Sequence, residues 1–332
     1  MIIRLLTQVL LATTLLQLYP ADAGVVERYA TLPAAENRQP GAYDALTLLN
    51  RTLPVAPDAS RAPVKVDATS VGVVTSAVSA VVVDRATGAV LYEKNSADPR
   101  SIGSISKLMT AFVFLKGTPD LSAAASIEPS DVRSGGVQHV SVGDPVSVAD
   151  LLHASLVGSD NSATAALVRL SGMNEGDFVS RMNETAAEIG MRETTFLDPT
   201  GLSADNRSIA PDLVRLVDEA MRIDAIREAT EMPSVSFRGG SGRVYTIETT
   251  DDLLHSFLNQ PPYKVIGGKT GFLPEAGYCL GSLVSENDGH ELLVVVLGSE
   301  TITGRFQDVK ALAAWAYKVY QWPDEKVQQQ SL

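Results

Sequence analysis

The chain has 332 residues, of which 45% are hydrophobic and 20% charged, a composition typical of globular proteins and sufficient for one large or two smaller domains. Its formal net charge of −12 argues against a nucleic-acid partner, because such partners require a basic surface. The single cysteine, Cys279, excludes an internal disulfide, and the four scattered histidines show no metal-ligand spacing, so we expect neither a metal nor another cofactor.

The first 23 residues differ from the rest of the chain. Arg4 precedes an apolar stretch over residues 5–19, and Ala21-Asp22-Ala23 offers the small-x-small pattern of a cleavage site. The stretch is short for a membrane span and contains several polar residues, which favours a cleaved signal peptide over an uncleaved anchor. We therefore expect cleavage near Ala23 and export to the periplasm or the extracellular space.

Residues 24–70 are rich in alanine and proline, and the prolines interrupt any periodicity, which indicates an extended leader or linker. Regular structure is expected from about Val74, with strand-like runs over 79–84 and 89–93 joined as a hairpin. We assign residues 71–322 to one domain. The polar tail, 323–332, has neither an apolar nor a cationic face, so no stable membrane anchor is predicted.

Helical patterns dominate the middle of the chain, about 117–260, and begin slightly before it. Apolar periodicity predicts a helix that starts near Ser104 and others over 178–189 and 212–228. Ser147-Val148-Ala149-Asp150 is a capping box that predicts a helix through Leu156.

Strands return towards the end of the chain, where residues 277–285 and 291–298 form a second predicted hairpin, followed by a helix over 305–320. Strands at both ends with helices between them indicate an α/β chain of the α+β type. Its antiparallel sheet would be completed by both ends of the chain, with a helical region inserted.

Three short strings stand out, in the order Ser104-Ile105-Ser106-Lys107, Ser159-Asp160-Asn161 and Lys269-Thr270-Gly271. Of nine lysines only Lys107 has a serine three residues before it, and Lys-Thr-Gly occurs once. The other Ser-x-Asn string, 285–287, lies in a hairpin-turn signal. Taken alone, each string is explained as a helix cap, a surface charge or a guarded strand edge. Taken together and in this order, they resemble the motif set of penicillin-recognising serine enzymes.

The first string supplies a nucleophile and its base. Ser104 and Lys107 are three residues apart at a helix start, so their side chains lie on one face within reach of each other. The positive end of the helix dipole would stabilise alkoxide character on Ser104. Lys107 must be neutral to accept a proton, and burial together with a nearby Lys269 would lower its pKa. We therefore predict Ser104 as the nucleophile and Lys107 as the general base.

The second string follows the predicted helix stop at Gly158, so we expect it in an exposed loop between helices. Ser159, bridging to a lysine, would relay a proton to the leaving amine. Asn161 would hold a substrate amide through its paired donor and acceptor.

The third string is expected on a strand that enters the second hairpin. Lys269 and the Thr270 hydroxyl suit a terminal carboxylate, and Gly271 permits close approach of the backbone. The substrate oxyanion would lie between the backbone amides of Ser104 and Phe272.

Over residues 78–322 the chain resembles the D-alanyl-D-alanine carboxypeptidase family, the low-molecular-mass penicillin-binding proteins. Besides the three strings, the resemblance is carried by residues 151–153, 190–191, 195–196, 199–202, 276–278 and 305–306. It implies a β-lactamase/transpeptidase-like fold, in which a five-stranded antiparallel sheet is flanked by helices and an all-helical region is inserted. It also implies a serine-type D-alanyl-D-alanine carboxypeptidase or endopeptidase that acts on peptidoglycan stem peptides through a Ser104 acyl-enzyme, with β-lactam antibiotics as covalent inhibitors.

Three departures limit what the resemblance specifies: the first two leave the carboxypeptidase and endopeptidase alternatives open, and the third raises a β-lactamase alternative. Many members carry a C-terminal β-rich domain and an anchoring helix, whereas this chain stops about ten residues after Trp322, as in soluble endopeptidase members. Some carboxypeptidases have an arginine upstream of the third string, and residues 249–254 contain none. Ser159-Asp160-Asn161 has the form found in class A β-lactamases, whereas Ser-Gly-Asn is frequent in the family.

Two further alternatives are a β-lactamase-like hydrolase and a catalytically silent wall-binding protein of the same fold. A class A β-lactamase needs a glutamate that activates the deacylating water, and the nearby candidate, Glu193, lies in a sequence that does not match. A silent protein would be expected to lose at least one of the key residues. All five are present: Ser104, Lys107, Ser159, Asn161 and Lys269.

Overall fold

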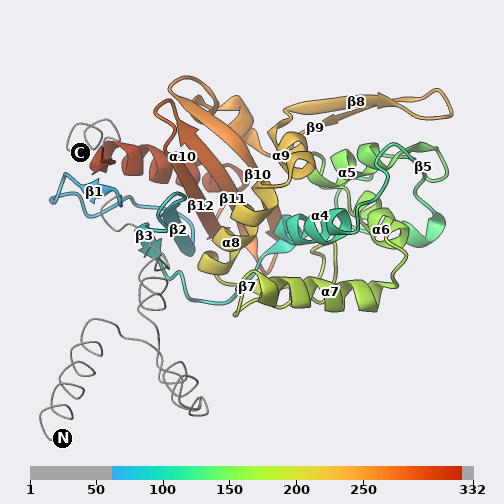
Figure 1. Ribbon diagram of the computed structural model, residues 1–332, viewed down its shortest axis with the longest axis horizontal. Coiled ribbons are helices and arrows are strands. Elements are labelled where there is room, and N and C mark those ends of the chain that lie inside the picture. Colours follow the sequence, from blue (N-terminus) through green and yellow to red (C-terminus); the bar gives the residue numbers. More distant parts are fainter. Residues whose placement is uncertain (1–61, 324–332) are drawn as a thin grey trace, which may run out of the picture. The chain divides into compact units, whose positions relative to one another are not determined.

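The structure, a computed structural model, describes residues 62–323 (Figure 1). The predicted signal peptide, the predicted leader up to residue 61 and the tail from residue 324 lie outside this part. The described residues form an antiparallel five-stranded sheet in the order β10-β11-β12-β2-β3. The strand bounds are β2 Ser79–Asp84, β3 Val90–Lys94, β10 Tyr263–Leu273, β11 Gly277–Glu286 and β12 Glu291–Ser299.

The sheet joins the two ends of the described chain, as the sequence predicted. β2 pairs with β12 from Leu292↔Asp84 to Leu297↔Ser79, so strands more than 200 residues apart lie side by side (Figure 1). β3 and β10 form the two edges. Both predicted hairpins, β2–β3 and β11–β12, are confirmed.

Helices cover both faces of the sheet. Val294 and Val295 of β12 are both fully buried but belong to different hydrophobic clusters, because successive strand residues point to opposite faces. One cluster lies under α10, Ile302–Val319, and the other under α8, Ala210–Met221. Burial of both faces explains why β2 and β12 read as continuous apolar runs.

A buried carboxylate fastens α10 to the sheet. Asp308 Oδ1 accepts the Ser76 amide at 2.8 Å, and Oδ2 accepts the Ala77 amide at 2.9 Å and the hydroxyls of Ser76 and Ser299 at 2.8 Å each. The chain that enters β2 and the end of β12 are thereby tied to one side chain. Asp308 lies one turn after Arg305 on α10, so the same bonds help to hold the part of the helix that carries Arg305.

The inserted region is built around α4, Ser106–Lys116, an almost entirely buried helix that packs against its neighbours on several sides. The predicted capping box is confirmed, since Ser147 and Asp150 bond each other's backbone amides at the start of α5. The surrounding helices are α5 Val148–Leu156, α6 Asn161–Leu170, α7 Glu175–Glu188 and α9 Asp224–Glu231.

The single helix predicted over 212–228 is wrong. The chain leaves the helical conformation at Ile223, whose ψ is 114°, and so forms α8 and α9 instead. The break turns the chain so that α9, with Ile226 and Ala229 buried, packs on β10. The break depends on this tertiary packing, which the apolar periodicity of the sequence does not reveal.

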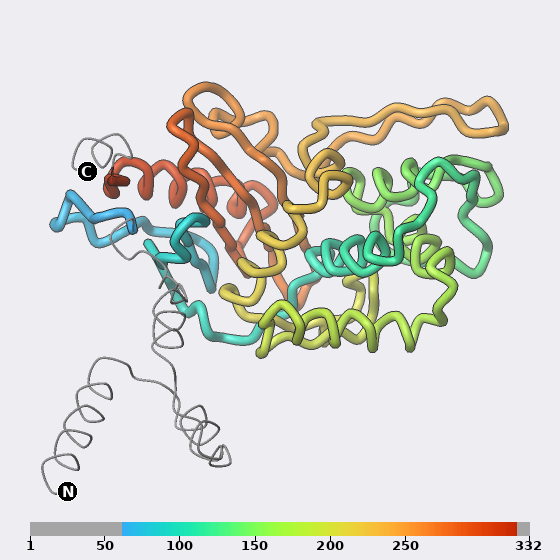
Figure 2. The backbone as a smooth tube through the Cα atoms, in the orientation of Figure 1, coloured from blue at the N-terminus to red at the C-terminus, as the bar shows by residue number. Residues whose placement is uncertain are grey.

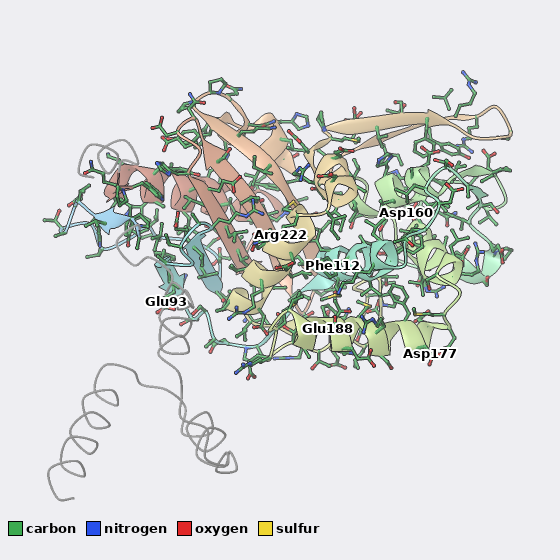
Figure 3. The ribbon with its side chains drawn as sticks, in the orientation of Figure 1. Glu93, Phe112, Asp160, Asp177, Glu188 and Arg222 are labelled. Atoms are coloured by element: carbon green, nitrogen blue, oxygen red, sulfur yellow. The ribbon has the colours of Figure 1, made fainter. Side chains whose placement is uncertain are left out.

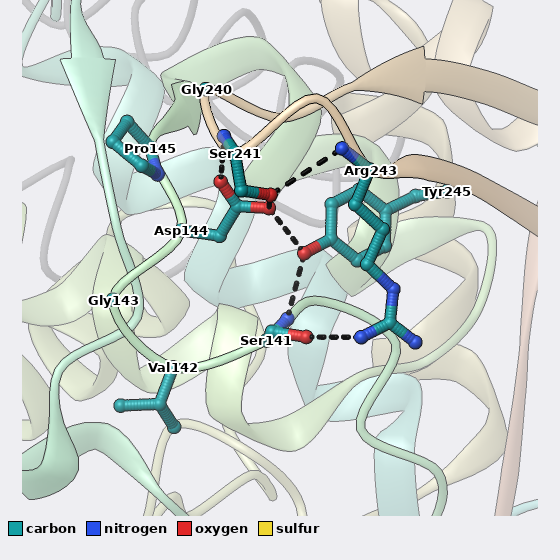
Figure 4. A pocket seen from close by; sticks show the side chains of 9 residues that line it. All are labelled: Ser141, Val142, Gly143, Asp144, Pro145, Gly240, Ser241, Arg243 and Tyr245. Carbon is teal, nitrogen blue, oxygen red and sulfur yellow. Dashed lines mark hydrogen bonds between the residues drawn. The ribbon is translucent and has the colours of Figure 1, made fainter.

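A hairpin that the sequence analysis missed, β8 Ser234–Arg238 and β9 Val244–Glu248, lies within the helical region and extends over the side of α5 (Figures 1 and 2). The alternation of polar and apolar residues in both strands and the glycine-rich turn, 239–242, were the signals available in the sequence. Asp144 holds the turn, accepting the Ser241 amide at 2.8 Å and the Tyr245 hydroxyl at 2.6 Å (Figure 4).

Short strand pairs complete the fold. β1, Val64–Lys65, pairs with β13, Tyr320–Gln321, so regular structure begins earlier than the expected Val74. The remaining short pairs are β4 Arg100–Ser101 with β7 Arg207–Ser208, and β5 Ala124–Ala125 with β6 Val146–Ser147. Within residues 62–323, no helix has the length and apolarity that crossing a membrane requires.

We predict that Asp308→Ala lowers the free energy of unfolding by about 3 kcal/mol, because two amides and two hydroxyls lose a buried ionic acceptor. Urea denaturation followed by tryptophan fluorescence measures the change. Asp205→Ala, at an exposed carboxylate, is the control and should change stability by less than about 0.5 kcal/mol. Equal stability of both variants would contradict the fastening role.

Candidate active site

The predicted nucleophile lies where the sequence placed it, at the start of a helix. Ser104 is half-buried in the 3₁₀ turn Gly103–Ile105, which leads directly into α4. Lys107 Nζ lies 3.0 Å from Ser104 Oγ. The predicted serine–lysine contact is therefore present in the structure.

Lys107 is fully buried and is surrounded by oxygen atoms. Besides Ser104 Oγ, its Nζ contacts Asn161 Oδ1 at 2.6 Å and the Thr200 carbonyl oxygen. These last two oxygens only accept hydrogen bonds, so they take up two N–H bonds of the amine. A neutral Lys107 therefore has its lone pair left for the hydroxyl hydrogen of Ser104.

The surroundings of Lys107 favour this neutral form near neutral pH. Burial lowers the pKa of Lys107 to about 7, against the opposing effect of the Asp198 and Asp160 carboxylates. A base with a pKa near the working pH combines a useful neutral fraction with a sufficient affinity for the proton.

The second string is not the exposed loop that we expected. Ser159 is half-buried with φ +58°, whereas Asp160 is fully buried and Asn161 is the first residue of α6. Asp160 caps α6 by accepting the amides of Ser162 and Ala163, where α5 and α6 meet (Figure 3). The aspartate in the middle of this string therefore serves as the N-cap of α6.

Two cavity-lining residues of the second string each accept a hydrogen bond from one of the two lysines. Asn161 accepts from Lys107 and donates through Nδ2 to the Gly135 carbonyl at 2.8 Å. Ser159 Oγ accepts from Lys269 Nζ at 3.0 Å. The lysine to which Ser159 bridges is thus the one on β10.

Lys269 is almost fully buried on β10, at the strand edge where it was predicted. It also lies 3.3 Å from the Thr270 carbonyl. Burial, followed by the positive charges of Lys107 and Arg305, lowers the pKa of Lys269 well below its usual value.

Close backbone contacts bring the nucleophile and β10 together. A Cβ on Gly271 would lie 2.3 Å from the Ile102 carbonyl oxygen, and one on Gly103 would lie 2.7 Å from the Phe272 amide nitrogen. Gly201 packs on the same turn, with a φ of +84° and a Cβ position 2.2 Å from the Gly103 oxygen. Side chains at these positions would displace the Ser104 turn from the strand.

A cavity of about 520 Å³ opens over Ser104. It is lined by members of all three strings, by loop residues on both sides and by the start of α10. The lining residues include Ser104, Gly135, Val137, Ser159, Asn161, Leu202, Thr250, Thr270, Gly271, Phe272, Ile302 and Arg305. Glu193 is exposed and is not part of this lining.

Arg305 is a cavity residue to which the sequence analysis gave no role. Its side chain is almost completely buried, and Nη1 donates to the Gly271 carbonyl at 3.2 Å. Thr250, from the segment without an arginine, contacts the Thr270 hydroxyl at 2.7 Å. A guanidinium from α10 thus lines the cavity beside the third string, and only the pair 305–306 in the resemblance pointed to it.

One side chain outside the three strings, that of Cys279, has a structural environment. Cys279 is fully buried beside the Ala276 carbonyl, and burial raises the pKa of its thiol to about 11, as fits a structural residue. In the described part of the chain, no group of three or more His, Cys, Asp or Glu side chains is placed to hold a metal ion.

Comparisons with known proteins agree with this geometry. The model of the D-alanyl-D-alanine carboxypeptidase family matches residues 65–301. A D-alanyl-D-alanine endopeptidase of Haemophilus influenzae is 34% identical over 57% of this chain and 64% of its own length. A D-alanyl-D-alanine endopeptidase of Pseudomonas aeruginosa is 33% identical over 68% of this chain and 72% of its own length.

A solved structure shows the same fold. Penicillin-binding protein D2 of Listeria monocytogenes, in its cefotaxime-bound form, superposes with a TM-score of 0.65 and 30% identity. The match covers 74% of this chain and 99% of that one. The predicted transpeptidase-like fold is therefore confirmed.

We predict that Asp198→Asn moves the pH dependence of acylation by a fluorescent penicillin to lower pH. Acylation needs neutral Lys107, so the rate should rise with pH through the pKa of about 7. The Asp198 charge raises that pKa, so its removal lowers the pH of half-maximal rate, by about half a pH unit or more.

Stopped-flow acylation rates between pH 5 and 9 provide the measurement. Asp205→Asn, an exposed carboxylate in the same loop, is the matched control and should leave the profile in place. An unchanged pH profile of the acylation rate in Asp198→Asn would show that Lys107 is not the base whose titration controls acylation.

Proposed function

Because this chain belongs to the D-alanyl-D-alanine carboxypeptidase family, we propose that it is a serine-type D-alanyl-D-alanine peptidase acting on peptidoglycan stem peptides. The observation that carries the proposal is the contact of 3.0 Å between Ser104 Oγ and a buried Lys107 whose pKa lies near 7. The enzyme class needs an activated serine, and this pair supplies it without a cofactor.

The first step is acylation of Ser104. Lys107 takes the hydroxyl proton as Oγ attacks the carbonyl carbon of a D-alanine residue, and the amides of Ser104 and Phe272 stabilise the oxyanion. The C–N bond then breaks. Ser159 gives a proton to the leaving nitrogen and recovers one from the protonated form of Lys269, which donates a hydrogen bond to it.

Water completes the cycle by hydrolysing the ester. As the water oxygen attacks, Lys107 returns its proton to Ser104 Oγ, and the proton released by the water passes through Ser159 to Lys269. Ser104, Lys107 and Lys269 are thereby restored. The acid product leaves, and no group outside the chain and the substrate is needed.

The other end of the cavity holds the carboxylate of the leaving residue. The Thr270 hydroxyl and the Arg305 guanidinium line this end, and Lys269 lies beside it. Asn161 would hold the peptide amide on the acyl side. Such a site suits a bond that follows D-alanine and precedes a residue with a free carboxylate.

The two alternatives differ from this proposal in specific ways. A class A β-lactamase would place a glutamate against the bound water, but Glu193 is exposed and lies outside the cavity lining. A silent wall-binding protein would have no use for a neutral lysine beside Ser104. The serine–lysine contact therefore favours an active enzyme over a silent protein, and the position of Glu193 favours a peptidase over a class A β-lactamase.

The reaction is placed outside the cytoplasmic membrane by the predicted signal peptide, residues 1–23. β-Lactam antibiotics should acylate Ser104, as supported by the fold shared with a cefotaxime-bound penicillin-binding protein. We further propose that the enzyme acts in cell-wall biogenesis and in the maintenance of cell shape.

We predict that the protein forms a covalent adduct with fluorescent penicillin and that Ser104→Ala abolishes it, because no other hydroxyl contacts Lys107 among the described residues. Labelling detected after denaturing electrophoresis is the measurement. Ser285→Ala, in the second Ser-x-Asn string, should label normally. An unlabelled wild-type protein would refute the peptidase assignment, and a labelled Ser104→Ala variant would refute the nucleophile.

Incubation with pentapeptide monomers and cross-linked dimers, followed by mass spectrometry, identifies the bond cut. We expect the wild-type protein to release D-alanine or to convert dimers to monomers, and Ser104→Ala to do neither. The product set distinguishes trimming from cross-link cleavage. Intact substrates after prolonged incubation with a penicillin-reactive wild type would contradict peptidase activity.

A further inference from the structure

A buried acid, Asp251, adjoins the end of the cavity proposed to hold the substrate carboxylate, next to the lining residue Thr250. Asp251 is 4% exposed and follows Thr250, whose hydroxyl contacts that of Thr270 at 2.7 Å. On β10, Lys269 immediately precedes Thr270. The Thr250–Thr270 hydrogen bond joins the segment that carries Asp251 to the strand that carries Lys269.

Only one oxygen of the Asp251 carboxylate accepts a hydrogen bond from the described residues. Oδ1 accepts the Leu253 amide at 3.0 Å and so caps the short turn Asp252–His255. Oδ2 is buried without a hydrogen-bond partner among residues 62–323. A serine or asparagine would cap the turn equally well without burying a charge, so the cap does not explain the acid.

Arg305 has a buried donor without a partner, which complements the unpaired acceptor of Asp251. Its Nη1 donates to Gly271, but its Nε is buried and lacks a partner within the described chain. The turn after Asp251 packs against α10, which carries Arg305. A buried anion beside the cavity wall and a buried cation in that wall thus lie near the same end of the cavity, and each has one polar atom without a hydrogen-bond partner among residues 62–323.

We propose that Asp251 is an internal anion that competes with the carboxylate of the substrate for Arg305 and Lys269, and thereby limits the affinity of the site for carboxylate-terminated peptides. This inference rests on the proposed peptidase function. Asp251 acts through the two cations and does not touch the reacting atoms, so it is a positioning residue.

The charges around Asp251 give the competition a pH dependence. Arg305 of α10 and Lys269 of β10 attract its negative form, Asp252 of the same turn repels it, and Lys107 of α4 lies beyond Lys269. Burial dominates and raises the pKa of Asp251 to about 6. The competing charge is therefore present above about pH 6 and is lost as the pH falls.

Peptide binding in a Ser104→Ala background, where no acylation interferes, tests the proposal. Isothermal titration calorimetry compares a peptide ending in D-Ala-D-Ala with a free carboxylate and the same peptide as a C-terminal amide, at pH 5 and pH 8. Asp251→Asn should bind the acid peptide about tenfold more tightly than the parent at pH 8. At pH 5 the two proteins should bind it equally.

Controls separate competition from a change of shape. The amide peptide should bind both proteins equally, and Asp252→Asn, at the adjacent exposed carboxylate, should leave all dissociation constants unchanged. Both proteins keep all the other charged groups of the site, so the difference between parent and Asp251→Asn reports on Asp251. If Asp251→Asn does not fold, Asp251→Ser keeps the cap without the charge and takes its place.

Equal or weaker binding of the acid peptide by Asp251→Asn at pH 8 would overturn the proposal, as would an equal gain for the amide peptide. Penicillin labelling of the wild-type protein shows whether only this inference fails or the proposed function fails as well. A labelled protein with no Asp251 effect refutes this inference alone. An unlabelled protein that binds neither peptide refutes the proposed function as well.

Discussion

The site depends on one buried amine. Lys107 has no contact with water, yet its Nζ meets three oxygens supplied by three separate segments of the chain. Two of these oxygens, on Asn161 and Thr200, can only accept, so they orient the amine, and the third belongs to the nucleophile. Burial supplies the energy that keeps this amine neutral near pH 7. The rest of the fold serves to bring these oxygens together.

That convergence explains several otherwise unrelated features. Gly103, Gly201 and Gly271 let three stretches of backbone meet without a side chain between them. Asp160 fixes the start of α6 and hence Asn161. On the opposite side of the sheet, the bonds of Asp308 hold α10 in place, so that a guanidinium reaches the cavity from outside the motifs. In the proposed function, the second lysine, on β10, adds the proton relay through Ser159 and binds the substrate carboxylate in the same cluster.

Much of this was predictable from the sequence because it depends on local patterns. The capping box at Ser147 and the two hairpins of the sheet have short-range signals, and the spacing of Ser104 and Lys107 fixes their contact within a helix. Properties that arise only from tertiary packing were missed. The residue pattern around Asp160 indicates a loop, whereas its burial follows from contacts with distant chain. Arg305 becomes a site residue only because α10 is clamped against the sheet.

The central claim is that Lys107 is neutral when the enzyme works. NMR of the protein with isotope-labelled lysine side chains, with the Lys107 signal assigned by comparison with Lys107→Arg, measures this directly. The account predicts that this signal titrates with a midpoint at about pH 7. A midpoint that stays near the ordinary lysine value of 10.5 would show a permanently charged Lys107, which could not accept the proton of Ser104.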